Sequence, residues 1–152
     1  MEFIHNIFLI ERSLSTRYYL ETRWQWYMSV IGLLKDRCKL LTDFADLGNY
    51  FFDDKFNYDE KGASKHFNKE NADRLRLLAA RFAGLSDFTA EKCELALRAL
   101  SEELSLKPAD LIHPTRLAVS GLTGGPSLFH LLEAVGKDRV LARIQRAIAS
   151  IE

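Results

Sequence analysis

The sequence predicts an all-α protein made of several helices. Nearly every segment with a readable hydrophobic pattern repeats with the period of an α-helix, and no alternating apolar and polar stretch is long enough for a sheet. Glycine, proline and capping residues separate these segments where helices usually begin and end. With 152 residues, 47% of them apolar and 28% charged, the chain has the length and composition of a soluble globular protein with a buried core.

Two helices are predicted in the first part of the chain. The first has an apolar stripe at helical spacing and ends near Arg37; the stripe consists of Trp24, Tyr27, Met28, Ile31 and Leu34. The second begins at Thr42 as a helix-capping residue and buries Phe44, Leu47 and Phe51. The polar run DDKFNYDEKG then interrupts the pattern. We therefore expect a first helical subdomain over residues 1–60 and a second over residues 61–152.

The second subdomain begins with two helices that have clear end signals. One has Leu75, Leu78, Phe82 and Leu85 on its buried face, and Gly84 is expected to end it in a left-handed conformation. The next is capped by Thr89, and its expected buried face consists of Cys93, Ala96, Leu97, Leu100 and Leu104.

Prolines and glycines divide the remainder of the chain. Pro108 and Pro114 are each expected in the first turn of a short helix, and Gly121 and Gly136 are expected to end helices. The last helix should bury one apolar face and expose arginines on the other. Its expected buried residues are Val140, Ile144, Ile148 and Ile151, and its expected exposed residues are Arg139, Arg143 and Arg146.

Composition excludes several classes of protein. Basic and acidic residues balance at 21 each, which argues against a protein that coats nucleic acid by bulk charge, although residues 61–152 have three more basic than acidic side chains. The two cysteines lack metal-site spacing, and the four histidines are scattered, so no metal site is expected. No apolar run approaches the roughly 20 residues that span a bilayer, and no signal peptide is recognisable. We expect a cytoplasmic protein.

The stretch GLTGGP, residues 121–126, is the most informative local feature. It lacks the pattern of a phosphate loop, and His113, Ser127 and His130 around it have neither an acidic partner nor a nucleophile elbow, so we expect no catalytic residues. A helix beginning at Pro126 would instead present unpaired amide groups, and Gly124 and Gly125 would let a ligand approach them. With Arg116 on the preceding helix, the turn would suit a flat anionic ligand such as an unpaired nucleotide. The alternative is an ordinary helix corner.

Two segments resemble bacterial glutamyl-tRNA synthetases. The run PTRLAVSGLTGGPSLFHLLEAVGKDRVLARIQRAI is similar to the C-terminal end of that family, and LLKDRCKLLTDFADLGNYFF is similar to its first anticodon-binding helices. The two segments occur in the family's order and at its spacing, and the resemblance covers about residues 18–151. Residues 1–17 remain an unassigned extension. The HIGH-like and KMSKS-like signatures of the catalytic domain are absent.

The resemblance implies a fold and a set of binding residues. In the family, two helical subdomains form a cage around the tRNA anticodon. Arg116 matches an arginine that contacts anticodon bases, and Pro126 and Leu128 match the turn against which the first two bases pack. Gly125 stands where threonine is frequent, so Thr123 would have to supply any hydroxyl contact. Arg37 matches the arginine that reads the third base; alternatively, it only caps its helix.

The resemblance also implies partners. We expect a monomer that binds the anticodon loop of tRNA, with neither DNA nor a membrane as partner. ATP and magnesium would be used by the catalytic domain of the intact ligase, so we expect no cofactor in this chain and no independent activity. Two alternatives stay open. One is a helical protein-interaction module that docks a partner on the arginines of the last helix and on Trp24, Trp26 and Tyr27, and the other is a free-standing tRNA-binding regulator.

Overall fold

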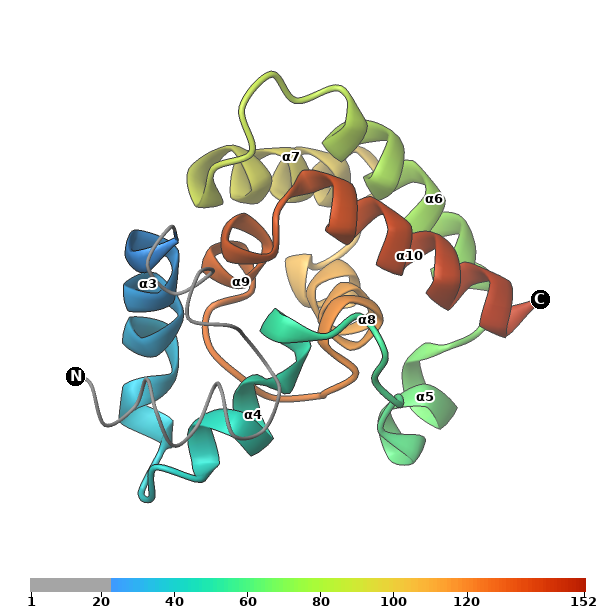
Figure 1. Cartoon of the computed structure of the whole chain (residues 1–152). Helices are drawn as coiled ribbons and strands as arrows, with labels where there is room; N and C mark the ends of the chain where they lie inside the picture. Colours follow the sequence, from blue (N-terminus) through green and yellow to red (C-terminus); the bar gives the residue numbers. More distant parts are fainter. Residues whose placement is uncertain (1–22) are drawn as a thin grey trace. The chain divides into compact units, whose positions relative to one another are not determined.

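The computed structural model describes residues 23–152, so the unassigned extension over residues 1–17 lies outside the described part. Within residues 23–152 all regular structure is helical, as the sequence predicts (Figure 1). The elements are α3 (Trp24–Leu34), the short 3-10 helix η2 (Lys35–Arg37), α4 (Asp43–Phe52), α5 (Glu60–His66), α6 (Lys69–Ala83), α7 (Ala90–Glu103), α8 (Pro108–Ser120), α9 (Leu128–Val135) and α10 (Lys137–Ile151). Among these helices, none is both long and apolar enough to cross a membrane.

The chain divides into two compact units, Met1–Phe56 and Asn57–Glu152. The boundary expected after residue 60 would fall just inside α5. The sequence places the division within the polar run before α5, where few apolar side chains are available for packing in either direction.

In the first unit, α3 packs against α4. The ring of Phe52 stacks on Tyr27, with ring centroids 6.0 Å apart, and meets the edge of Trp26 at 5.7 Å. Gly48 permits close contact between the helices, because a Cβ there would lie 2.6 Å from Cδ1 of Leu34. Trp26 and Tyr27 therefore contribute to packing within this unit.

The buried stripe of α3 differs from the predicted one. Tyr27, Val30 and Leu34 are buried, whereas Met28 is 37% exposed. On α4, Phe51 is buried as expected but Leu47 is 38% exposed. The stripe follows the i, i+3, i+7 row through Val30, which the sequence pattern alone could not distinguish from the neighbouring row through Met28.

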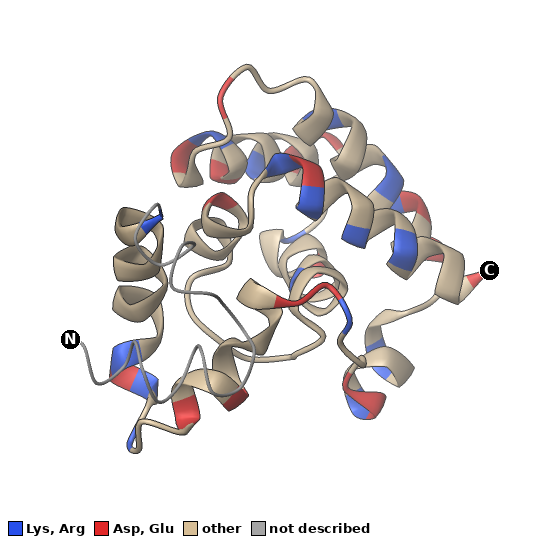
Figure 2. Cartoon of the chain, viewed as in Figure 1, with Lys and Arg blue, Asp and Glu red and all other residues tan. Residues whose placement is uncertain are grey.

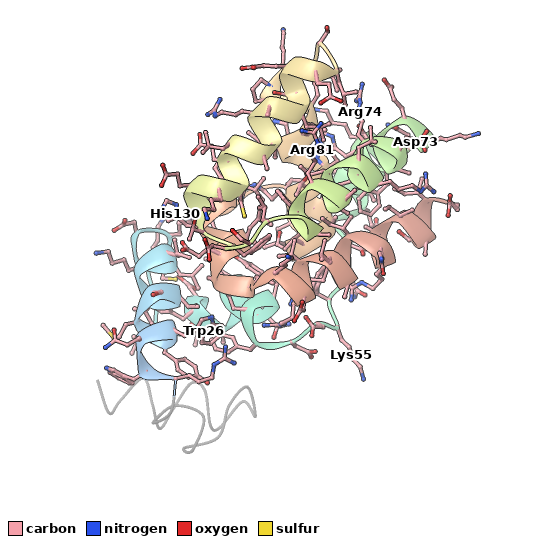
Figure 3. All side chains as sticks on the ribbon, turned by 90° about the horizontal axis from the view of Figure 1, so that it is seen from above. Trp26, Lys55, Asp73, Arg74, Arg81 and His130 are labelled. Atoms are coloured by element: carbon pink, nitrogen blue, oxygen red, sulfur yellow. The ribbon has the colours of Figure 1, made fainter. Side chains whose placement is uncertain are left out.

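In the second unit, α8 lies among α6, α7, α9 and α10, and α5 packs against its outer side (Figure 1). The core contains Leu75, Leu78, Leu97 and Leu100 as predicted, together with Phe82 and Cys93, whereas Leu85 and Leu104 lie beyond the ends of their helices and are only partly buried. The side chains with no exposed surface include Leu75, Leu78, Leu97, Leu111, Leu117, Leu131, Leu132, Val140 and Ile144. On the surface, Arg81 of α6 forms an ion pair with Glu103 of α7 (Figure 3).

Most predicted helix ends are confirmed. Oγ1 of Thr89 accepts a hydrogen bond from the amide of Lys92 at 3.3 Å, so Thr89 caps α7. Gly121 and Gly136 end their helices with φ values of 76° and 89°, where glycine is favoured. Gly84 ends α6, but the expected left-handed conformation is wrong: its φ is −76°. Its amide bonds to the carbonyls of Ala80 and Arg81, which keeps the last turn right-handed.

The prediction of a separate helix at Pro114 is also wrong. Pro108 is the first residue of α8 as expected, but Pro114 lies inside the same helix. A proline inside a helix removes one backbone hydrogen bond and crowds the preceding turn. Here Leu111 and Leu117, both completely buried, anchor the helix on either side of Pro114. Burial of these leucines offsets the missing bond.

Candidate nucleic-acid interface

The turn between α8 and α9 has an exposed outer edge and a well-bonded frame. Leu122, Thr123 and Gly124 are exposed, whereas Gly121 and Pro126 at its two ends are buried. The amide of Gly121 bonds to the carbonyl of Leu117 at 2.8 Å, and the Leu122 amide bonds to Oγ of Ser120 at 3.2 Å. Gly125 has a φ of 150°, which favours glycine. The turn therefore presents backbone to solvent in a defined shape.

The helix after the turn begins later than predicted. Its first residue is Leu128 and its N-cap is Ser127, so Pro126 belongs to the turn. Ser127 makes no side-chain capping bond. Leu128 is only 2% exposed and packs into the core. The proline and leucine expected at the site thus support the turn from beneath, because their apolar side chains are covered.

Arg116 meets the turn, but from the inside. Its Nη1 donates to the carbonyl oxygen of Pro126 at 2.7 Å, and only 9% of the residue is exposed. The structure therefore brings together Arg116 and Pro126 as the sequence suggested. The guanidinium binds the backbone of the turn, so much of it faces protein.

The expectation that Arg143 is exposed on the last helix is wrong, because the residue is only 2% exposed and lies on the buried face of α10. Its Nη1 donates to the carbonyl oxygen of Val119 at 2.6 Å. The sequence contained the signal: Arg143 follows Val140 by three residues and precedes Ala147 by four, which places it on the buried face. Arg139 and Arg146, by contrast, are partly exposed.

The beginning of α5 supports the turn from a third side. The amide of Asp59 donates to the carbonyl of Gly121 at 2.8 Å. A Cβ at Gly62 would lie 2.4 Å from Cγ2 of Thr123 and 3.2 Å from Cδ1 of Leu117. Sequence reasoning missed this contact, because nothing local in the segment YDEKG indicates a neighbour some sixty residues away.

Arg37 lies in the first unit and has a different environment. It is the last residue of η2, between the exposed Lys35 and Lys39, and its own side chain is exposed. Figure 2 shows basic and acidic residues side by side at this end of α3, because Asp36 lies between Lys35 and Arg37. Within residues 23–152 its guanidinium has no hydrogen bond or ion pair, so the structure shows no capping bond from it to the helix.

The histidines and cysteines of the described residues are not gathered into a metal site. No group of three or more histidine, cysteine or acidic residues there could hold a metal ion. His66 stacks on His113 with ring centroids 5.5 Å apart, and His130 lies exposed on α9 (Figure 3). Cys93 is fully buried, and that burial raises the pKa of its thiol to about 12.

The match to known proteins agrees with this architecture. A family model described as an anticodon binding domain matches residues 9–148, and the chain belongs to this family of anticodon-binding domains. The match includes residues 9–17, for which the sequence had shown no resemblance. The class defined by the helical fold and this match is therefore an anticodon-binding domain.

The similar proteins are more specific. A glutamate–tRNA ligase of Moorella thermoacetica is 44% identical over 128 residues, which is 84% of this chain and 26% of the relative. Glutamate–tRNA ligase 1 of Caldanaerobacter subterraneus is 41% identical over 130 residues, 85% of this chain and 27% of the relative. A solved glutamate tRNA ligase from Elizabethkingia meningosepticum superimposes with a TM-score of 0.84 at 28% identity, covering 95% of this chain and 27% of that one. The chain thus spans about a quarter of the length of these relatives.

Proposed function

We propose that the chain is the anticodon-binding part of a glutamate–tRNA ligase and that its partner is the anticodon loop of tRNA. The observation that carries the proposal is the anticodon-binding family match over residues 9–148, together with the similarity to glutamate–tRNA ligases along most of the chain. A protein-interaction module is less well supported, because Trp26, Tyr27 and Arg143 are used in packing within their own units.

In this proposal the first two anticodon bases rest on the turn between α8 and α9. The exposed residues Thr123 and Gly124 and the partly exposed Gly125 offer backbone hydrogen-bonding groups without bulky side chains, which lets a base approach closely. Pro126 and Leu128 form the apolar floor beneath it. Arg116 acts mainly through the carbonyl of Pro126, with its small exposed fraction facing the base.

Arg37 would read the third anticodon base from the first unit. A guanidinium only donates hydrogen bonds, so it suits the acceptor atoms of cytosine and opposes the donors on the pairing edge of guanine. Glutamate and glutamine anticodons differ at this base. The exposure of Arg37 and the absence of a partner in the described residues leave its donors available for RNA.

The intact ligase would use ATP and magnesium in its catalytic domain, and the proposal assigns neither to this chain. It also assigns a monomeric state, because one tRNA needs one copy of each unit. Neither DNA nor a membrane is a partner in this proposal. Such a protein would work in the cytoplasm.

The test is a binding titration with a labelled stem-loop that carries a glutamate anticodon. A second stem-loop keeps the stem and changes only the three anticodon bases. We expect the first to bind more tightly, and its affinity to fall roughly tenfold between about 50 and 200 mM salt as phosphate contacts are screened. Equal binding of the two loops would refute anticodon recognition, and binding indifferent to salt would favour an apolar docking module.

A further inference from the structure

Arg143 is a buried charged residue that the proposed function does not use. It lies on α10, 24 positions from Val119, whose carbonyl accepts a hydrogen bond from its Nη1. Val119 is the penultimate residue of α8. The contact therefore joins two helices that are distant in sequence, directly beside the start of the turn.

The chemistry of helix ends explains why a guanidinium suits this place. The last four carbonyls of an α-helix have no partner within the helix and carry partial negative charge. At the end of α8, the Leu117 carbonyl is bonded by the amide of Gly121, and the Val119 carbonyl is bonded by Arg143. A hydrogen bond from a charged donor is about twice as strong as a neutral one, and burial shields it from water.

The two buried arginines hold opposite ends of the same turn. Arg143 binds the carbonyl two residues before Gly121, and Arg116 binds the carbonyl of Pro126 just after Gly125. Between these points the chain passes through Gly121 and Gly125, both with positive φ. Glycines allow many conformations, so a single shape requires that both ends be fixed.

We propose that Arg143 is a positioning residue for tRNA binding, whose buried guanidinium fixes the end of α8 and thereby the shape of the turn. This inference rests on the proposed function of the turn. It assigns Arg143 no contact with RNA. A turn held in its binding shape avoids the cost of ordering it when RNA binds, and loss of that order weakens affinity.

The test compares R143Q, R143K and R98Q with the unchanged chain. R143Q removes the charge, and R143K keeps a charge and one donor group. R98Q is the matched control, because Arg98 lies on the surface of α7 in an ion pair with Glu94 and loses the same charge without affecting the turn. Each variant is measured for hydrogen exchange by mass spectrometry and for anticodon stem-loop affinity, well below its unfolding temperature.

For R143Q we expect faster exchange over residues 117–127 and unchanged exchange over residues 84–89. We also expect the stem-loop affinity to fall roughly tenfold, which corresponds to about the free energy of one charge-assisted hydrogen bond. R143K should recover part of both effects, and R98Q should show neither. If R143Q does not fold, R143K is expected to show the same local changes at smaller size. These results would support positioning through the turn.

Three results would overturn the inference. The first is exchange over residues 117–127 that stays as in the unchanged chain. The second is exchange that rises equally across the second unit, which marks a merely structural role. The third is a loosened turn with unchanged affinity. Failure of the unchanged chain to bind the stem-loop is a separate outcome. It would overturn the proposed function, and with it the role of Arg143 in RNA binding. The exchange measurement involves no RNA and would still test whether Arg143 fixes the turn.

Discussion

The arginines of the two units stand in opposite environments. Arg116 and Arg143 of the second unit are almost completely buried and donate to backbone carbonyls around the turn. Arg37 of the first unit is exposed and has no partner in the described residues. The same type of side chain is therefore bonded to the backbone at one site and open to solvent at another. Burial, which depends on helical position, decides between these roles.

The largest expected effect is on stability, and it tests the contrast between the buried and the exposed arginines. R116M removes the donor to Pro126 and leaves a buried carbonyl without that bond, so we expect the free energy of unfolding to fall by about 2 kcal/mol. R37Q is the matched control, since an exposed substitution should change stability by less than about 0.5 kcal/mol. Urea unfolding followed by circular dichroism measures both. An equal loss of unfolding free energy in R116M and R37Q would contradict the contrast between the buried and the exposed arginine.

A second, smaller effect tests whether the turn is held in one conformation. G121A places a Cβ at a φ of 76°, and we expect it to destabilise the protein by about 1 kcal/mol. G84A makes the same change at the end of α6, where φ is −76° and the nearest atom to the new Cβ is 3.5 Å away. It should be neutral or slightly stabilising. Thermal unfolding that ranks the two variants in reverse would contradict a fixed left-handed Gly121.

Arg37 should affect recognition and leave folding unchanged. R37Q replaces a pure donor with a group that both donates and accepts, so guanine at the third anticodon position is no longer opposed. We expect the affinity ratio between glutamate and glutamine stem-loops to narrow severalfold, by an amount equivalent to about 1 kcal/mol. Parallel titrations of R37Q and the unchanged chain give this ratio. An unaltered ratio would remove Arg37 from base reading.

The smallest expected effect concerns pH and is confined to the second unit. Burial, then the neighbouring His113 and then Lys65 lower the pKa of His66 from its usual 6.5. Between the lowered pKa and 6.5 the unfolded chain binds more protons at His66, so stability falls as pH decreases through this window. We expect H66Q to lose part of this dependence in unfolding titrations, whereas H130Q should keep it. A pH dependence unchanged in H66Q would exclude the histidine pair as its source.

The sequence predicted helices well because their signals are local. The cap at Thr89, the first turn at Pro108 and the stops at Gly121 and Gly136 depend on residues within a few positions of each other, and all are confirmed. The expectation that a new helix begins at Pro114 was wrong, because burial of Leu111 and Leu117 on either side outweighs the local cost of a proline inside a helix. Local signals cannot report what distant helices contribute.

The site was harder to predict for the same reason. The turn, Arg116 and Pro126 were singled out correctly as neighbours, since only ten residues separate Arg116 from Pro126. That Arg116 lies beneath the turn depends on packing in the second unit. The supports from Arg143 and Gly62 come from segments far along the chain, and no pattern in GLTGGP points to either.

The contrast between the two thiols has a practical consequence. Cys93 is inaccessible and its pKa is about 12, so maleimide reagents have little thiolate to attack there. Cys38, one residue after Arg37, is partly exposed. Its pKa is also raised, by burial and then by Asp43, but the residue is far less buried than Cys93. A fluorophore can therefore be attached selectively beside Arg37 in the unmodified sequence.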